Sequence, residues 1–339
     1  MKKATYIPNY DVNLNNKVFD SPGGAYLRSL FARHGYDLQT IDIHKIDDSD
    51  IILQADLISE EITSDIYNDK SFLIIWENEV IVPRNFIMDY HKRYKAVFTW
   101  HEDLVDNSFY YKINYGQYIP SEVDFLPPHE KTKLCVLINA KKFSCHKDEL
   151  YSERIRLLDW FEKHHFGELD LYGVGWGESK SLLERLLDLK LNFKRTPLYF
   201  TKHGKYLLRN EYKSYQGPCP YEYKITTMRQ YKFAICFENA SYPGYITEKI
   251  FDCFFAGCVP IYLGAPNILE YIPKNTFIDF RNFTSYKDLY SFITNMSDKE
   301  YSNILQNIHN YLMSEEIKYF SAFKIYENVV DVIMKKMNH

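Results

Sequence analysis

Residues 231–262 read YKFAICFENASYPGYITEKIFDCFFAGCVPIY, and they carry the clearest structural pattern of the chain. The segment opens with an apolar run that is typical of a buried parallel strand. Thr247 can cap a helix whose body, residues 250–255, is apolar on several sides, and Gly257 suits the end of that helix. The apolar residues 259–262 indicate a second buried strand. The segment therefore predicts a strand, a helix and a strand of a parallel α/β sheet.

A cluster of polar residues separates the first strand of this unit from its helix. Glu238, Asn239 and Ser241 follow the strand directly, and Gly244 and Tyr245 come next. Ligands of α/β sheets bind outside the carboxyl ends of the strands, and a helix N-terminus favours anions. The cluster therefore predicts an anion-binding crevice. An ordinary polar loop in a Rossmann-like core is the alternative.

The same segment resembles the donor-binding motif of glycosyltransferase family 10, the α1,3/α1,4-fucosyltransferases. That motif consists of a FEN triplet, a short variable loop, Y-(V/I)-T-E-K, a helix and a P-I-Y strand. Its fixed parts stand in this order at residues 237–239, 245–249 and 260–262. The resemblance extends over most of residues 70–330. It implies the GT-B fold, an α/β architecture of two Rossmann-like doubly wound domains facing across a cleft.

The rest of the chain contains two sets of alternating strand-like and helix-like segments. The predicted strands lie at residues 4–8, 38–43, 71–76, 96–100, 133–138 and 169–172, and the predicted helices at 25–34 and 152–163. This alternation predicts two doubly wound domains with a cleft between them. Three prolines between residues 118 and 130 indicate a linker. We therefore expect an acceptor-side domain at 1–125 and a donor domain at 131–320, with the C-terminal segment, 320–339, able to pack back on the first.

Length and composition limit the class of protein. The chain has 339 residues, which is enough for two domains of ordinary size. With 46% apolar and 25% charged residues the composition is globular, and the formal net charge of −4 gives no indication of nucleic-acid binding. An anionic ligand would therefore need a local cationic pocket.

Cysteine usage and hydropathy bear on the compartment. The six cysteines form no C-x-x-C pair, and the three in apolar runs, Cys236, Cys253 and Cys258, are interpreted as buried free thiols, which favours a reducing cytoplasm. The first residues lack the apolar core of a signal peptide, and no apolar run approaches membrane-spanning length. Segment 323–337 is amphipathic and contains two adjacent lysines near its end. We expect a cytoplasmic protein in which this segment docks on the fold, with peripheral contact to the inner face of the cytoplasmic membrane as the alternative.

A D-x-D motif is the usual sign of a metal-dependent sugar transferase, because the metal stabilises the departing diphosphate. The clear D-x-D of this chain is Asp48-Ser49-Asp50, in a polar stretch far in sequence from the donor motif. We interpret it as a solvated loop. The sequence therefore predicts neither a metal nor another cofactor, so that cationic side chains replace the metal.

Two cationic side chains are candidates for this role. Lys249 stands at the predicted helix start, where the helix dipole disfavours a cation unless an anion is present. Arg154 resembles the family's helix-borne arginine that contacts the diphosphate. Arg156 is the alternative, because this chain carries a charged insert at 141–153 before the helix. We prefer Arg154, since the two leucines that follow then face inward.

The resemblance assigns further donor contacts. It implies that Glu248 accepts hydrogen bonds from donor hydroxyls, and that Asn239 and Tyr245 shape the sugar or ribose site. Lys224 falls where the family often has a lysine. Glu238 comes directly after a strand, where a carboxylate can bind backbone amides, so its expected role is structural.

A general base must take the proton from the acceptor hydroxyl, and we expect it in the first domain. Glu77 ends the strand at 71–76, and Pro83 follows six positions later. This arrangement resembles the family's segment in which a glutamate ends a strand. Glu79 is the alternative base.

The residues, taken together with the resemblance, imply an inverting, metal-independent glycosyltransferase. The resemblance implies transfer of L-fucose from GDP-β-L-fucose to a hydroxyl of a glycan, with an α1,3-type linkage. The expected acceptor is an oligosaccharide or a lipid-linked glycan of lipopolysaccharide, capsule or O-antigen. Two alternatives stay open: a transferase of the same family that uses another nucleotide sugar, and a non-catalytic nucleotide-sugar binding protein.

Overall fold

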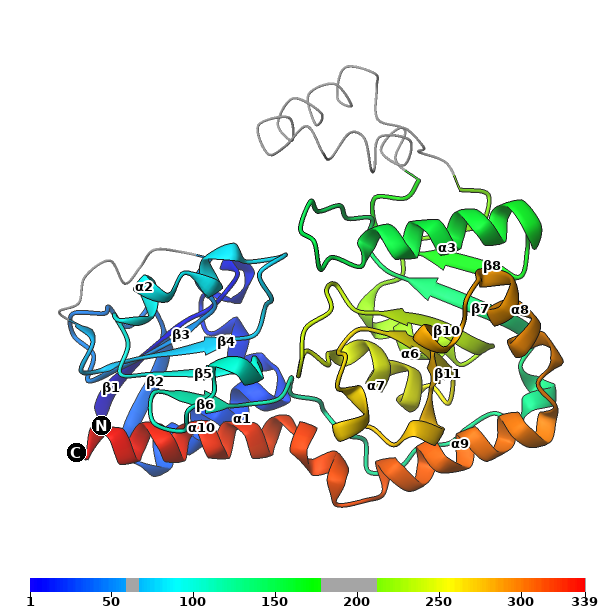
Figure 1. The fold of residues 1–339 in the computed structure, drawn as a ribbon. Helices are drawn as coiled ribbons and strands as arrows, with labels where there is room; N and C mark the ends of the chain where they lie inside the picture. The colour runs from blue at the N-terminus through cyan, green and yellow to red at the C-terminus, as the bar shows by residue number, and fades with distance from the viewer. Residues whose placement is uncertain (59–66, 178–211, 339) are drawn as a thin grey trace. The chain divides into compact units, whose positions relative to one another are not determined.

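The computed structural model describes residues 1–58, 67–177 and 212–338 (Figure 1). The chain divides into two compact units. The first unit comprises Met1–Ile119, Tyr242–Ile246 and Glu315–His339, and the second comprises Pro120–Ser241 and Thr247–Ser314. Within the described residues, each unit contains a six-stranded sheet in which every pairing is parallel.

The sheet of the first unit has the strand order β2-β1-β3-β4-β5-β6. Its strands are β1 (Lys2–Ile7), β2 (Tyr36–Thr40), β3 (Ile51–Ala55), β4 (Ser71–Ile75), β5 (Ala96–Thr99) and β6 (Tyr110–Lys112). The central strands β3, β4 and β5 are buried at every position. Such continuous burial is expected of a parallel sheet that is covered on both faces.

The helices described in the first unit lie on both faces of its sheet. The α-helices that the structure describes in this unit are α1 (Pro22–Arg33), α2 (Met88–His91) and α10 (Ala322–Met337). Apolar side chains of α1 and α10 share one core with the sheet, and Figure 1 shows the two helices on the same side of it. The hydroxyl of Tyr26 in α1 donates to Glu327 Oε1 of α10 at 2.6 Å. The amphipathic C-terminal segment therefore buries its apolar face in the first unit.

The sheet of the second unit has the strand order β12-β11-β10-β7-β8-β9. Its strands are β7 (Lys133–Ile138), β8 (Leu169–Tyr172), β9 (Tyr215–Gly217), β10 (Tyr231–Phe237), β11 (Val259–Leu263) and β12 (Ile278–Asp279). Strands β10 and β11 pair in register from Phe233 opposite Val259 to Phe237 opposite Leu263. The strand order reverses direction beside β7, which is the switch point where doubly wound folds bind ligands.

Three of the helices described in the second unit stand between its strands along the chain, and two follow the last strand. They are α3 (Tyr151–His164), α6 (Tyr221–Met228), α7 (Glu248–Phe255), α8 (Tyr286–Asn295) and α9 (Asp298–Leu312). Helix α7 connects β10 to β11, as residues 231–262 predicted, and Gly257 follows it with φ +60. A Cβ atom at Gly257 would lie 2.6 Å from the ring of Phe125, so the position needs glycine for space as well as for its backbone angle.

The predicted parallel α/β class is confirmed, and the differences lie in individual strands. Strand β2 ends at Thr40, before the predicted end at residue 43. Strand β3, Ile51–Ala55, was not predicted, although it lies beside β1 and β4 at the centre of its sheet. Its sequence, IILQA, includes a glutamine that the buried hydroxyl of Tyr94 satisfies at 2.6 Å. Because this polar residue interrupts a short apolar run, the sequence pattern did not indicate strand β3.

Candidate functional site

A buried carboxylate joins the end of β10 to the start of α7. Glu238 is fully buried, and its backbone N–H donates to Leu263 O at 2.7 Å. Its Oε1 accepts the backbone N–H of Thr247 at 2.8 Å, and its Oε2 accepts the Thr247 hydroxyl at 2.7 Å. Lys249 Nζ lies 3.2 Å from the same Oε2. The expected structural role of Glu238 thus corresponds to contacts that hold the helix start against the sheet.

Thr247 is the N-cap residue of α7, but its side chain does not cap the helix. The sequence predicted a cap in which the hydroxyl accepts a helix N–H. Instead the hydroxyl donates to Glu238 and accepts from Lys249 Nζ at 3.0 Å. The prediction of a threonine cap was right about the position and wrong about the bond, because a buried carboxylate competes for the hydroxyl.

Lys249 is held as a cation in a largely buried position. Its side chain is 12% exposed, and its Nζ lies 3.3 Å from Glu248 Oε1. Burial lowers the pKa of Lys249, but the carboxylates of Glu248 and Glu238 outweigh burial and raise that pKa above its ordinary value. The nearby guanidinium of Arg154 also opposes protonation, which places two positive groups close together. Positive charge gathered at a helix start is an arrangement that an anionic ligand stabilises.

Lys224 adds a third cation from α6. Its Nζ lies 2.5 Å from Oδ2 of Asp252 in α7. Burial lowers the pKa of Lys224, but the charges of Asp252 and Glu248 outweigh burial, so the pKa lies above its ordinary value. For Glu248, burial raises the pKa, but Lys249 and Lys224 reverse this and lower it to about 2. Glu248 is therefore a carboxylate at neutral pH, able to accept hydrogen bonds from hydroxyl groups.

Arg154 reaches the end of β10 from helix α3. The residue is 3% exposed, and its Nη2 donates to Phe237 O at 2.6 Å and to Asn239 Oδ1 at 3.0 Å. The segment before α3 runs beside the same place, since the N–H of Leu150 donates to Asn239 O at 3.1 Å. The N–H of Ser241 donates to the backbone oxygen of residue 148 at 2.9 Å. The structure thus brings Arg154 and Asn239 together.

Arg156 lies on another side of α3. Its Nε donates to Glu153 Oε2 at 3.0 Å, and Glu153 Oε1 accepts the hydroxyl of Tyr286 in α8 at 2.6 Å. The guanidinium therefore pairs within its own helix and near α8. Between the two arginines that the sequence left open, only Arg154 contacts the residues that follow β10.

The structure places Tyr245 among aromatic side chains of the first unit. Tyr245 is 1% exposed, and its ring centroid lies 4.6 Å from that of Trp100. It belongs to the segment Tyr242–Ile246, which is part of the first unit. Gly244 has φ +77, and a Cβ there would lie 2.6 Å from Trp100 O. Within the first unit Tyr245 thus packs against Trp100, and its role in shaping the sugar or ribose site stays a prediction.

In the first unit, Asp56 holds the turn that carries Glu77. Asp56 follows β3, is buried, and has φ +52, an unusual angle for a residue with a side chain. Its Oδ1 accepts the backbone N–H groups of Trp76 at 2.8 Å and Glu77 at 3.0 Å. Asn85 Nδ2 bridges from Asp56 Oδ1, at 2.8 Å, to Glu77 O, at 2.9 Å. The backbone of Glu77 is thus fixed on two sides.

Sequence reasoning did not single out Asp56. The signal was present, because an aspartate directly after a buried strand stands where the carboxyl ends of parallel strands meet. Burial raises the pKa of Asp56, and the N–H groups of Glu77 and Trp76 act against that effect. What the sequence cannot show is that β3 and β4 are neighbours, and this pairing brings Asp56 to residues 76 and 77.

The two candidate bases differ in their surroundings. Both side chains are half-buried. Glu79 Oε2 accepts the hydroxyl of Tyr242 at 3.4 Å. Burial raises the pKa of Tyr10, and the charges of Glu77 and Asp56 raise it further, which places the Glu77 carboxylate near that phenol. The choice of Glu77 over Glu79 stays a prediction.

The D-x-D motif directly precedes β3, and its last aspartate contacts the start of β1. Asp50 Oδ2 accepts the backbone N–H of Lys3 at 3.0 Å, and Ser49 Oγ lies 2.6 Å from Thr5 Oγ1. Across residues 1–58, 67–177 and 212–338, no group of three or more His, Cys, Asp or Glu side chains is arranged to hold a metal ion. Of the helices that the structure describes, none has the length and apolarity that crossing a bilayer requires.

Similarity to known proteins concentrates on the second unit. The sequence model described as "Glycosyltransferase family 10 (fucosyltransferase) C-term" matches residues 128–315, just over half of the chain. An α-(1,4)-fucosyltransferase of Arabidopsis thaliana is 28% identical over 173 residues, which cover 51% of this chain and 36% of the relative. The human 4-galactosyl-N-acetylglucosaminide 3-α-L-fucosyltransferase FUT5 is 32% identical over 114 residues, covering 33% of this chain and 30% of the relative. The alignments thus span only about a third of these relatives.

Solved structures resemble the whole chain in fold. An α1,3-fucosyltransferase with GDP-fucose aligns with a TM-score of 0.53 at 12% identity, covering 99% of this chain and 91% of that structure. The β-glucosyltransferase of phage T4 in complex with UDP and Mn²⁺ aligns with a TM-score of 0.56 at 12% identity, covering 99% of this chain and all of that structure. At such identities the likeness shows the fold, which is the GT-B arrangement of two Rossmann-like domains. Because the family model covers more than half of its length, the chain belongs to glycosyltransferase family 10 (fucosyltransferase).

Proposed function

We propose that this chain transfers L-fucose from GDP-β-L-fucose to a hydroxyl group of a glycan. The observation that carries the proposal is the grouping of Lys249, Glu248, Arg154 and Asn239 where β10 ends and α7 begins. Lysine and arginine supply positive charge for a diphosphate, and the carboxylate and amide supply acceptors and donors for sugar hydroxyls. The names of several relatives refer to fucosyl transfer, and one similar structure contains GDP-fucose.

The leaving group requires charge stabilisation. As the bond to fucose breaks, negative charge grows on the β-phosphate of GDP. Lys249 and Arg154 act on that charge, and the N-terminus of α7 adds the favourable end of its dipole. Protein cations then take the part that a divalent metal plays in other transferases, so we propose that the reaction needs no metal.

The acceptor requires a base. We propose that Glu77 removes the proton of the acceptor hydroxyl, while that oxygen attacks the anomeric carbon on the side opposite GDP. One direct displacement converts the β-linked donor into an α-linked product. The clamp from Asp56 and Asn85 supports this role, because it fixes the backbone of Glu77.

The setting of the reaction is proposed on less direct grounds. All six cysteines are free thiols, which supports a reducing, cytoplasmic compartment. The proposed acceptor class is an oligosaccharide or lipid-linked glycan of a cell-surface polysaccharide, with an α1,3-type linkage. The names of relatives point to galactosyl-N-acetylglucosamine as the first acceptor to try.

The test combines the chain with GDP-fucose, N-acetyllactosamine and excess chelator, and follows the fucosylated product by mass spectrometry. Product is expected with the chelator present. Activity that stops in chelator and returns only with Mn²⁺ or Mg²⁺ contradicts the metal-free mechanism. If the chain hydrolyses another nucleotide sugar in preference to GDP-fucose, that nucleotide sugar is the donor. If the chain binds GDP-fucose tightly but fucosylates nothing on a glycan array, it is a non-catalytic nucleotide-sugar binding protein.

A further inference from the structure

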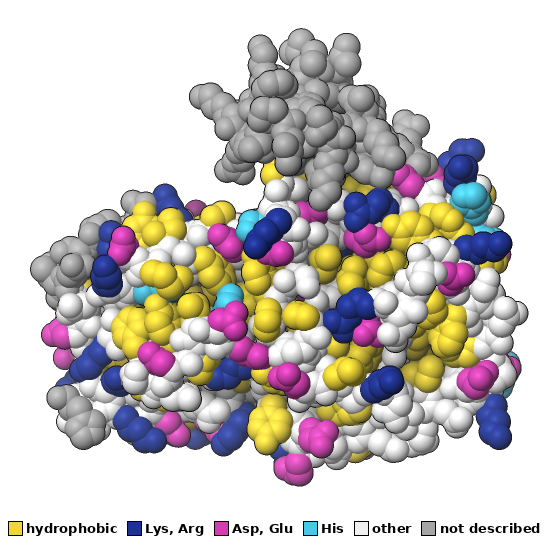
Figure 2. All heavy atoms as spheres, viewed as in Figure 1, with side chains coloured by type: hydrophobic (Ala, Val, Ile, Leu, Met, Phe, Trp, Pro, Cys, Tyr) yellow, Lys and Arg dark blue, Asp and Glu magenta, His cyan; other side chains and the backbone are white. Residues whose placement is uncertain are grey.

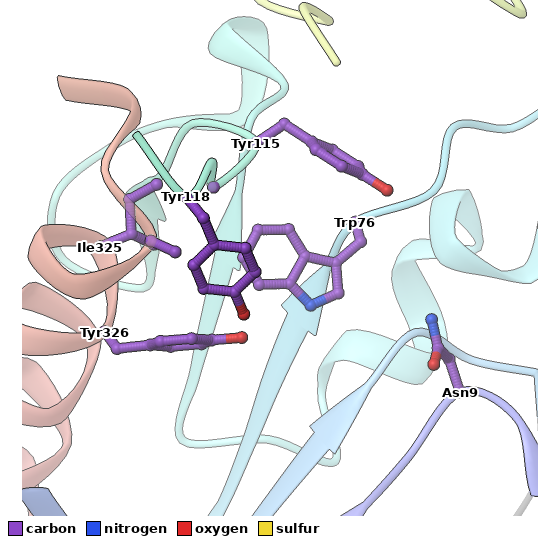
Figure 3. A pocket seen from close by; sticks show the side chains of 8 residues that line it. Asn9, Trp76, Tyr115, Tyr118, Ile325 and Tyr326 are labelled. Carbon is purple, nitrogen blue, oxygen red and sulfur yellow. The ribbon is translucent and has the colours of Figure 1, made fainter. Parts of the chain in front are cut away.

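A cavity in the first unit lies beside the turn that carries Glu77. It has a volume of about 180 Å³. Figure 3 shows the side chains that surround it, which come from the ends of β1 and β4, from the segment after β6 and from α10. The principal lining residues are Asn9, Trp76, Tyr115, Tyr118, Ile325 and Tyr326.

The walls of this cavity combine ring faces with hydroxyl groups. The ring of Trp76 has its centroid 5.8 Å from that of Tyr115 and 6.5 Å from that of Tyr326, with both tyrosines close to perpendicular to it. Burial raises the pKa of Tyr326, so its phenol stays protonated and can donate a hydrogen bond. Asn9 adds an amide on the side away from α10 (Figure 3). Among the described residues that line the cavity, none is charged.

Such a lining suits a neutral sugar ring. A pyranose has C–H groups that can lie against the negative face of an aromatic ring, and hydroxyls at its rim that need hydrogen-bond partners. The volume lies below the roughly 300 Å³ at which pockets for drug-sized ligands begin. A nucleoside diphosphate is larger and needs cations. One uncharged hexose unit fits both the size and the chemistry.

One carboxylate connects this cavity to the candidate base. Asp56 Oδ2 accepts from Asn9 Nδ2 at 3.3 Å, and Asp56 Oδ1 accepts the N–H of Trp76 at 2.8 Å. The same Oδ1 accepts the N–H of Glu77 at 3.0 Å. Two walls of the cavity and the backbone of Glu77 are thus fixed to the same buried group. A sugar in the cavity is therefore held in a constant relation to that backbone.

We propose that this cavity is a subsite for a neutral hexopyranose ring of the glycan acceptor. The proposal rests on the proposed fucosyl transfer for its choice of acceptor over donor sugar. Trp76 and Tyr115 pack against the sugar ring, and the phenol of Tyr326 and the amide of Asn9 bind its hydroxyls. The subsite gives the first unit a means of selecting the sugar whose hydroxyl Glu77 activates.

Binding without donor provides the first test. Saturation-transfer NMR is recorded on the full chain with N-acetyllactosamine, lacto-N-biose and methyl β-D-galactopyranoside, with L-fucose as the donor-sugar control. In the parent protein, at least one galactoside is expected to show a saturation-transfer signal. Tyr115→Ala should bind that galactoside about tenfold more weakly. Trp76→Phe keeps a ring and should retain binding. Tyr90→Ala, a half-buried tyrosine on the other face of the sheet, is the matched control.

The contrary outcomes are distinct. The subsite is overturned if none of the three galactosides gives a saturation-transfer signal. It is also overturned if Tyr115→Ala binds galactosides as well as the parent does, or if the protein binds L-fucose in preference to them. Kinetic measurements test the subsite separately from the proposed function. In Tyr115→Ala the KM for the acceptor should rise about tenfold, while the KM for GDP-fucose stays unchanged. A rise in the donor KM overturns the assignment to the acceptor. A parent protein that binds galactosides but not GDP refutes the proposed function and leaves the sugar site standing.

Discussion

The carboxylate of Glu238 accepts both hydrogen bonds that Thr247 can donate, one from its backbone N–H at 2.8 Å and one from its hydroxyl at 2.7 Å. The two residues are nine positions apart, and the bonds close the loop that carries the middle of the motif. Because the hydroxyl donates to Glu238, its oxygen is turned to accept from Lys249. Figure 2 shows acidic and basic side chains interspersed over the visible face, whereas this buried group concentrates charge at one helix start.

Glu238→Gln should destabilise the second unit. An amide has a single acceptor oxygen, so one bond from Thr247 is lost and an N–H group is set against a donor. A loss of about 1–3 kcal/mol in the free energy of unfolding is expected, measured by chemical denaturation. Glu222→Gln on the exposed surface of α6 is the control and should change stability by less than about 0.5 kcal/mol. Equal effects of the two variants would contradict the role of the buried carboxylate.

Arg154→Ala and Lys249→Ala should weaken GDP binding as well as turnover. Each removes a cation from a largely buried site, at a cost of about 2–5 kcal/mol in binding free energy, measured by titration calorimetry. Arg156→Ala is the matched control, since its guanidinium pairs with Glu153. Loss of GDP affinity in Arg156→Ala with retention in Arg154→Ala would transfer the phosphate contact to the other arginine.

Glu77→Gln should leave GDP affinity nearly intact and reduce turnover about a hundredfold or more, since it keeps the size of the side chain but removes its basicity. Glu79→Gln should be milder, because the Glu79 carboxylate is engaged by Tyr242. Rates are compared at saturating donor and acceptor. An inactive Glu79→Gln beside an active Glu77→Gln would move the base by two residues. Full activity in both would place the base elsewhere.

Asp56→Ala should reduce kcat while GDP affinity, a property of the second unit, stays unchanged. The N–H groups of Trp76 and Glu77 lose their shared acceptor, and the glutamate loses its fixed position. As a positioning effect, the loss should alter the dependence of kcat on pH and should be partly restored in Asp56→Asn, which keeps an acceptor oxygen. Asp50→Ala, which removes an exposed bond to Lys3, is the control. A stability loss with an unaltered kcat and pH profile would reduce Asp56 to a structural residue.

Acid should destabilise the second unit through Glu248. Its pKa in the folded chain is about 2, lower than in the unfolded chain, so its contribution is present above the unfolded pKa. That contribution is lost as the pH falls through the range from the unfolded value towards 2. Glu248→Gln should flatten the dependence of stability on pH in this range, measured by denaturation at a series of pH values. If the free energy of unfolding of the variant depends on pH as that of the parent does, the charges of Lys249 and Lys224 do not lower the pKa of Glu248.

The sequence predicted those parts of the molecule that depend on neighbours along the chain. The strands β4, β7 and β10 are predominantly apolar runs, and their predicted positions agree with the structure. Strand β12 has two residues and forms only through its pairing with β11, so no local pattern announces it. The same distinction applies to the site. Lys249 and Glu248 stand in one motif, but the bond from Arg154 to Asn239 spans 85 positions and needed the fold.

The antiparallel bridge of Glu149 to Ala240 places a short segment of the second unit alongside the residues that follow β10. Cys145 lies four residues before that bridge and is exposed, whereas Cys236, Cys253 and Cys258 are buried. Thiol-reactive dyes should therefore reach position 145 without entering the core. In a Cys219→Ser background, which removes the partly exposed thiol, a fluorophore at Cys145 would sit on the segment that leads to Arg154, and under the proposed function its emission would report nucleotide occupancy.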